Sequence, residues 1–212
     1  MIRILLVDDH PVVRQGIRAI LIERLKGAVI GEAGDAGSAL RQVRDGDWDV
    51  VVADISLPAM SGLDLIKELR RTSPHLPTVV LSMHPAAQFA RRALKAGAVG
   101  YLTKDSAPDE LVAAIDEARR GRRYVGRDLH DVPSHWGRRV KSGAPKHELL
   151  SDREYQILRM LGSGRAPSGI ARDLGLSPKT ISTYRMRVLE KLGMRTNAEL
   201  MRYAIENNLL ES

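Results

Sequence analysis

The chain has 212 residues, of which 43% are apolar and 28% are charged, a composition typical of folded globular proteins. Cysteine is absent, which excludes disulfides, thiol nucleophiles and cysteine-ligated zinc or iron–sulfur sites. No apolar run approaches the roughly 18 residues of a membrane span, and the amino terminus runs into acidic residues rather than a signal peptide. We therefore expect a cytoplasmic protein with no membrane partner.

Charge is unevenly distributed along the chain, which carries a formal net charge of +7. Residues 1–120 contain 16 basic and 16 acidic residues, whereas residues 121–212 contain 17 basic and 10 acidic residues. A basic surface favours nucleic acid or an anionic membrane as a partner. The asymmetry therefore predicts two units with different partners.

The first 120 residues alternate short apolar runs, rich in β-branched residues, with segments whose apolar residues have helical spacing. Five such strand–helix units predict an α/β fold with a doubly wound, five-stranded parallel sheet. The predicted strands are Ile2–Val7, Ala28–Ala33, Val50–Ala53, Thr78–Leu81 and Val99–Leu102.

Polar residues follow four of these strands: Asp8 and Asp9, then Asp54, Ser82 and Lys104. In open α/β sheets the ligand site lies beyond the carboxyl ends of the strands, so we expect these side chains to converge. Crowded carboxylates repel each other unless a cation lies among them, and hard oxygen ligands suit Mg²⁺. Asp54 can then attack a phosphoryl group to form an aspartyl phosphate, while Lys104 neutralises the phosphoryl oxygens and Ser82 donates a hydrogen bond.

Residues 1–120 resemble the receiver domain of two-component response regulators, which has a flavodoxin-like fold. The resemblance rests on the run from Val7 to Pro11, the run from Asp54 to Gly62, the pair Leu81-Ser82 and the run from Gly100 to Lys104. One departure is Asp105, which follows Lys104 where many receivers have a proline in a cis peptide. The loop after the fifth strand is therefore expected to differ, or to accept the cost of a non-proline cis bond.

This resemblance implies a role for each matching residue. Asp54 would be phosphorylated by a partner sensor histidine kinase, and Lys104 and Ser82 would contact the phosphoryl group. Tyr101 would be an aromatic switch that moves inward when Ser82 does. The implied Mg²⁺ ligands are Asp8, Asp9, Asp54 and the backbone carbonyl of Ser56.

Residues 121–147 lose the strand–helix rhythm and gather glycine, proline, arginine and histidine, which predicts a linker. From residue 148 the pattern is helical, and the predicted helices span 152–162, 167–174, 178–192 and 197–207. The turn Gly175-Leu176-Ser177 between the second and third helices is typical of a helix-turn-helix unit, whose second helix enters the major groove of DNA.

The outward face of the helix at 178–192 supplies the predicted DNA contacts. Residues expected to contact base edges are Lys179, Ser182, Thr183 and Met186, and those expected to contact phosphates are Thr180, Arg187 and Lys191.

Residues 148–210 resemble the LuxR-type DNA-binding domain. The matching motifs are Leu150–Glu154, Ile170–Leu174, Leu176–Ile181 and Lys191–Gly193. In that family the fourth helix forms the dimer contact, which implies Met201, Ala204, Ile205 and Asn208 as contact residues. A departure is the helix-disfavouring Gly169, which predicts a second helix that begins late or is mobile.

The order of a receiver (1–120), a linker (121–147) and a LuxR-type domain (148–212) resembles a NarL/FixJ-type response regulator. It implies a phosphorylation-controlled transcription factor, not an enzyme, that binds double-stranded DNA at inverted repeats as a homodimer. One alternative is a phosphotransfer or phosphohydrolase enzyme. Ser56 disfavours it, because haloacid-dehalogenase-like phosphohydrolases carry a second aspartate at that position. The other alternative is a regulator that binds DNA without phosphorylation.

Overall fold

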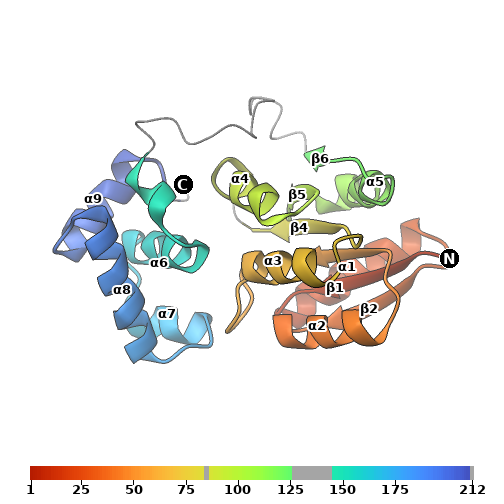
Figure 1. Ribbon diagram of the computed structural model, residues 1–212, viewed down its shortest axis with the longest axis horizontal. Coiled ribbons are helices and arrows are strands. Elements are labelled where there is room, and N and C mark those ends of the chain that lie inside the picture. Colours follow the sequence, from red (N-terminus) through yellow and green to blue (C-terminus); the bar gives the residue numbers. More distant parts are fainter. Residues whose placement is uncertain (84–85, 126–144, 211–212) are drawn as a thin grey trace. The chain divides into compact units, whose positions relative to one another are not determined.

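The computed structural model describes residues 1–83, 86–125 and 145–210, which form two units (Figure 1). The units are residues 1–134 and 135–212, and the boundary falls inside the predicted linker. Most of that linker, residues 126–144, lies outside the described residues. Within the described residues, no helix is both long enough and apolar enough to span a membrane.

The first unit alternates strands and helices and contains one parallel sheet, ordered β2-β1-β3-β4-β5-β6. Its helices are α1 (Pro11–Arg24), α2 (Ala36–Asp45), α3 (Gly62–Thr72), α4 (Ala86–Ala96) and α5 (Ala107–Arg119). Its strands are β1 (Arg3–Val7), β2 (Val29–Ala33), β3 (Val50–Ala53), β4 (Thr78–Ser82), β5 (Gly100–Thr103) and β6 (Tyr124–Val125). The five predicted strands and their parallel arrangement are confirmed, with ends that differ by at most one residue.

The two-residue strand β6 was not predicted, because it falls at the start of the segment expected to be a linker. It pairs in parallel with β5, with Tyr124 opposite Gly100. The Tyr124 hydroxyl also lies 3.0 Å from a carboxylate oxygen of Glu110 on α5. The sheet pairing and the contact between Tyr124 and Glu110 therefore place residues 124 and 125 in the first unit, beyond the predicted receiver boundary at residue 120.

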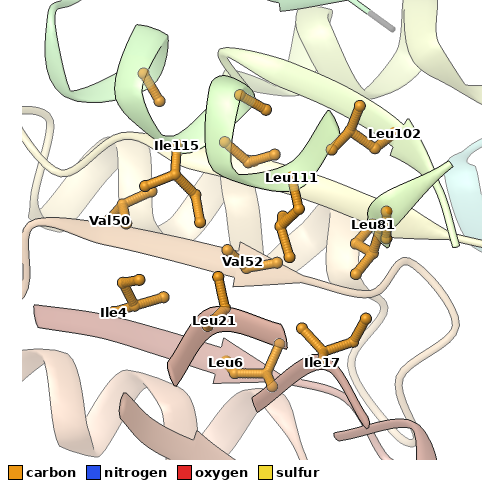
Figure 2. Close-up of a cluster of buried hydrophobic side chains, with 14 residues drawn as sticks. Ile4, Leu6, Ile17, Leu21, Val50, Val52, Leu81, Leu102, Leu111 and Ile115 are labelled. Carbon is orange, nitrogen blue, oxygen red and sulfur yellow. The ribbon is translucent and has the colours of Figure 1, made fainter. Parts of the chain in front are cut away.

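Two apolar clusters cover the two faces of this sheet. On one face, Ile17 and Leu21 of α1 and Leu111 and Ile115 of α5 pack against residues of β1, β3, β4 and β5 (Figure 2). On the other face, residues of α2 and α3 pack against alternate residues of β1 and β3. Burial on both faces explains why these strands are continuous apolar runs.

The second unit consists of helices around a small core (Figure 1). A 3₁₀ helix, η2 (Lys146–Leu149), precedes α6 (Asp152–Gly162), α7 (Pro167–Asp173), α8 (Pro178–Leu192) and α9 (Asn197–Glu206). Capping boxes begin α6 at Ser151 and α9 at Thr196. These helices confirm the predicted spans to within one residue.

Gly169 does not delay the start of the second of these helices, so the expectation of a late start is wrong. Helix α7 begins at Pro167 and runs through Gly169. Proline at the first helical position fixes a helical φ, and the buried residues Ile170 and Ala171 anchor the helix to the core. Tertiary packing therefore outweighs the propensity cost of about 1 kcal/mol for one glycine.

Candidate functional site

The predicted strand-end residues of the first unit come together at the carboxyl edge of the sheet. Parallel pairing of β1 and β3 places Asp8 and Asp54 one residue beyond neighbouring strands, and the backbone N–H of Asp54 donates to the carbonyl of Val7 at 2.9 Å. Likewise, the Lys104 N–H donates to the Ser82 carbonyl at 2.8 Å. These backbone hydrogen bonds thus fix the positions of Asp54 and Lys104 at the carboxyl edge of the sheet.

Lys104 bridges two of the carboxylates. Its ammonium nitrogen lies 2.6 Å from Oδ2 of Asp8 and 2.9 Å from Oδ2 of Asp54. The Lys104 side chain is 7% exposed and each carboxylate side chain is 4% exposed, so little water screens these charges. The ammonium therefore partly offsets the repulsion between two buried carboxylates. The peptide bond after Lys104 is trans, like all others in the described residues.

The buried surroundings of Asp54 shift the pKa of its carboxyl upward. Burial raises the pKa of its carboxyl above the ordinary value of 3.8, Lys104 opposes this rise, and the charge of Asp8 adds to it. Its second oxygen, Oδ1, is buried and accepts no hydrogen bond from the described residues. A buried acceptor without a hydrogen-bond donor lowers the stability of the fold. This oxygen is therefore a candidate to bind a ligand.

The same cluster has the donor set of a divalent metal site. Asp8, Asp9, His10 and Asp54 each offer one ligand atom, and these atoms all lie within 4.8 Å of one another. Hard carboxylate oxygens suit Mg²⁺, and the unsatisfied Oδ1 of Asp54 fits a cation at this position. His10 was not among the predicted ligands.

The remaining predicted residues surround this cluster at different depths. Ser82 and Tyr101 are fully buried, so the Tyr101 ring already lies inside the protein in this structure. Ser56 is partly buried, in the loop that follows Asp54. The structure places these residues near the carboxyl ends of β3, β4 and β5, and their roles stay predictions.

The raised pKa of Asp54 predicts that this residue costs the receiver stability at neutral pH. A carboxyl whose folded pKa is raised binds its proton more tightly in the native state, so the free energy of unfolding falls as pH rises from about 4 through the raised pKa. Asp54→Asn removes this dependence. We expect the variant to exceed the wild type in stability by more at about pH 7.5 than at about pH 4.5, measured by hydrogen exchange of the β3 amides. An equal difference at both pH values would contradict the assignment.

In the second unit, helix α8 presents the predicted outward face. Lys179, Ser182, Thr183 and Met186 are exposed, whereas Ile181 and Val188 are buried. The hydroxyl of Ser182 donates to the Pro178 carbonyl at 3.0 Å. The hydroxyl of Thr183 donates to the Lys179 carbonyl at 3.0 Å.

These hydrogen bonds within α8 limit which hydrogen bonds its exposed face can form with a partner. Because both hydroxyl protons are used within the helix, the two oxygens present acceptors to a partner. The exposed thioether of Met186 adds an apolar contact of the kind that suits a thymine methyl group. The guanidinium of Arg187, one of the predicted phosphate contacts, lies 5.9 Å from the ring centroid of Tyr184.

Lys191 forms an ion pair within the second unit, although its side chain remains partly exposed to solvent. Its ammonium nitrogen lies 2.7 Å from Oε2 of Glu154 on α6, with side chains 41% and 4% exposed. The same oxygen accepts the backbone N–H of Ser151 in the capping box. Although burial alone would raise it, hydrogen bonds from Lys191 and Ser151 hold the pKa of Glu154 below its ordinary range. Lys191 therefore joins α8 to α6, which residue spacing did not reveal.

The predicted dimer residues on α9 do not form one exposed face. Met201 and Ile205 are exposed, one helical turn apart, and Asn208 follows the helix with a φ of 52°. Ala204 is fully buried, so its assignment as a dimer contact is wrong. A Cβ built on Gly162 would lie 2.7 Å from the Ala204 Cβ, which shows that α6 and α9 meet there. Ala204 belongs to the core because its position on α9 turns it toward α6.

Comparison with known proteins identifies similar domains in both units. The family described as "Response regulator receiver domain" matches residues 4–116, and "Bacterial regulatory proteins, luxR family" matches residues 148–204. Response regulator UvrY of Escherichia coli (strain K12) is 37% identical over 210 residues, which cover 99% of this chain and 96% of that protein. Response regulator GacA of Pseudomonas aeruginosa is 33% identical over 217 residues, covering 100% of this chain and 99% of that protein.

Solved structures share the arrangement of elements. RcsB from Salmonella enterica serovar Typhimurium, bound to promoter rprA in the presence of phosphomimetic BeF3⁻, has a TM-score of 0.63 at 28% identity and covers 96% of this chain and 98% of that chain. A LuxR-family two-component response regulator from Aurantimonas sp. SI85-9A1 has a TM-score of 0.57 at 44% identity, covering 60% of this chain and 91% of that chain.

Proposed function

Because this chain belongs to the two-component response regulators with a LuxR-type DNA-binding domain, we propose that phosphorylation of Asp54 controls its binding to DNA. The phosphoryl donor would be a sensor histidine kinase in the cytoplasm. The observation that carries the proposal is the buried Oδ1 of Asp54, which accepts no hydrogen bond from the described residues while Oδ2 is bound by Lys104. One oxygen is thus available as a nucleophile and the other is held in place.

The proposed reaction uses residues at the carboxyl edge of the sheet. Oδ1 of Asp54 attacks phosphorus, a new oxygen–phosphorus bond forms, and the bond from phosphorus to the donor's leaving atom breaks. The Lys104 ammonium neutralises a phosphoryl oxygen, and the Ser82 hydroxyl donates a hydrogen bond to another. Mg²⁺, which Asp8, Asp9, Asp54 and the Ser56 carbonyl would hold, supplies further neutralisation of the phosphoryl charge when bound.

The DNA-binding half of the proposal rests on α8 and the turn before it. Exposed acceptors and Lys179 at the start of α8 suit base edges in the major groove. A similar protein of known structure, RcsB, has been solved as two dimers bound to two parallel DNAs. We propose that this chain binds inverted-repeat sites as a phosphorylation-dependent homodimer, with the receiver in the first unit and the DNA-binding domain in the second.

The test compares wild type and Asp54→Asn after incubation with Mg²⁺ and acetyl phosphate. Oligomeric state, and affinity for a duplex selected from random sequences with the wild type, are then measured. We expect only the wild type to dimerise and to bind the duplex more tightly. Equal DNA binding before and after treatment would favour the phosphorylation-independent regulator. Steady release of phosphate from small phosphoesters would favour the enzyme.

Two lysines on α8 allow a matched test of the DNA-binding face. Lys179 is exposed, so Lys179→Ala should change base preference and leave the stability of the second unit unaltered. Lys191→Ala leaves the buried Glu154 carboxylate without its ammonium partner, so we expect a loss of about 1 kcal/mol in the free energy of unfolding, since half-exposed pairs are partly screened. Lys191→Ala should also weaken binding to all DNA sequences by a similar factor. The slope of log affinity against log salt concentration should become smaller by about one unit. Binding and unfolding assays on both variants decide between these roles.

A further inference from the structure

A nitrogen ligand lies beside the carboxylates of the proposed phosphorylation site. Nδ1 of His10 is 2.8 Å from Oδ1 of Asp9 and 3.5 Å from Oδ1 of Asp8. Neighbouring ligands of an octahedral ion with bonds of about 2.1 Å are separated by roughly 3 Å. These spacings suit ligands of one ion.

The His10 imidazole has no role in holding its own helix. His10 is the N-cap of α1, yet its side chain makes no capping hydrogen bond and is 63% exposed. The backbone does the positioning, because the His10 N–H donates to Oδ1 of Asp8 at 2.8 Å and the His10 carbonyl accepts the N–H of Arg14 at 3.0 Å. Backbone hydrogen bonds therefore position the His10 ring beside the carboxylates of Asp8 and Asp9.

A second observation points to a ligand at the same place. Lys104 binds Oδ2 of both Asp8 and Asp54, whereas the buried Oδ1 of Asp54 has no hydrogen-bond donor among the described residues. The ammonium thus satisfies one oxygen of each carboxylate. This oxygen is on Asp54, which belongs to the same four-residue group as His10, and one ligand atom from each of the four residues lies within 4.8 Å of the others.

We propose that His10 is a further ligand of this site, and that it makes the site prefer imidazole-binding divalent transition metal ions such as Ni²⁺ over Mg²⁺. Imidazole nitrogen is a good ligand for transition metals, whereas Mg²⁺ selects oxygen ligands and keeps several waters. His10 therefore adds affinity for transition metal ions and little affinity for Mg²⁺. The inference rests on the proposed function, because it uses the same carboxylates.

The test uses the full-length protein without an affinity tag and measures binding of Mg²⁺ and of Ni²⁺ by calorimetry. We expect His10→Ala to weaken Ni²⁺ binding at least about tenfold, as for other lost metal-site interactions, and to change Mg²⁺ binding less than about twofold. His75→Ala is the matched control, because His75 is an exposed histidine of the same unit in the loop before β4. It should alter neither affinity, and Mg²⁺ should compete with the Ni²⁺ that His10 helps to bind.

Pulsed electron paramagnetic resonance of the Mn²⁺-loaded protein gives a direct second readout. The wild type and His75→Ala should show coupling to a ligand nitrogen, and His10→Ala should lose it. An equal loss of Ni²⁺ and Mg²⁺ affinity in His10→Ala, or a nitrogen signal that persists in it, overturns the role of His10. If the wild type binds Mg²⁺ and takes up phosphate, that failure concerns His10 alone. If the wild type binds neither ion competitively and takes up no phosphate, the proposed function fails as well.

Discussion

Replacing Lys104 by methionine is expected to abolish phosphoryl uptake and to lower the free energy of unfolding of the first unit by about 3 kcal/mol at pH 7. Asp8 and Asp54 would then face each other in a buried site without their cation. Removing one partner of a buried ion pair leaves an uncompensated charge, which typically costs 3 to 5 kcal/mol. Burial already raises the pKa of Asp54 against the opposing effect of Lys104, so the variant should raise it further.

This rise in pKa gives the prediction a pH signature. Protonation of a carboxyl relieves the repulsion, so the stability deficit of Lys104→Met should shrink between about pH 7 and pH 5. Hydrogen exchange of the β1 and β3 amides measures the deficit at each pH. Lys67→Met is the matched control, because Lys67 pairs with Asp64 at 3.3 Å with both side chains about half exposed, and surface pairs contribute 0 to 1 kcal/mol. A deficit no larger in Lys104→Met than in this control would contradict the buried bridge.

Gly62→Ala is expected to lower the stability of the first unit by about 3 kcal/mol and to slow phosphoryl uptake. Gly62 begins α3, and its N–H donates to the Ile55 carbonyl at 2.8 Å, which closes the loop after Asp54. A Cβ at this position would lie 1.9 Å from the Asp54 carbonyl oxygen and 2.8 Å from the Ile55 Cα. Since both neighbours are backbone atoms, the helix or the phosphoacceptor strand must move.

Gly16 supplies the control for this substitution. It lies inside α1 and is exposed, and a Cβ there would meet nothing within 4 Å. Gly16→Ala should therefore stabilise the unit by about 0.5 to 1 kcal/mol through helix propensity. Unfolding by urea and the initial rate of phosphorylation by acetyl phosphate are measured for both variants. If Gly62→Ala and Gly16→Ala change stability and phosphorylation rate equally, close packing around Gly62 does not explain why a glycine is needed at that position.

Periodicity was sufficient to predict most of the fold. The strand Val50–Ala53 is continuous and apolar because both of its faces are buried, so its pattern located it to the residue. Helix α8 was equally clear, since Ser177 and Pro178 mark its start and Gly193, with a φ of 70°, marks its end. Strand β6 has two residues, too few for any pattern, and it exists through pairing with β5.

The residues of the site were predicted more accurately than the contacts between them. The order of strands in a parallel sheet brings their carboxyl ends together, so Asp8, Asp54 and Lys104 could be expected to meet. Which atoms pair could not be predicted, since that depends on side-chain conformation. The same limit hid the ion pair between Lys191 and Glu154, which joins residues 37 positions apart. It also hid the burial of Ala204, which depends on how α9 packs against α6.

The central claim, that Asp54 accepts the phosphoryl group, is tested most directly by locating that group in the chain. The protein is incubated with acetyl phosphate and Mg²⁺, reduced with borohydride and digested, and the peptide containing residue 54 is analysed by mass spectrometry. Borohydride converts an aspartyl phosphate to homoserine, so we expect homoserine at position 54 in the wild type and no reduction product in Asp54→Asn. Homoserine at position 8 or 9, or none anywhere in a protein that has gained phosphate, would contradict the claim.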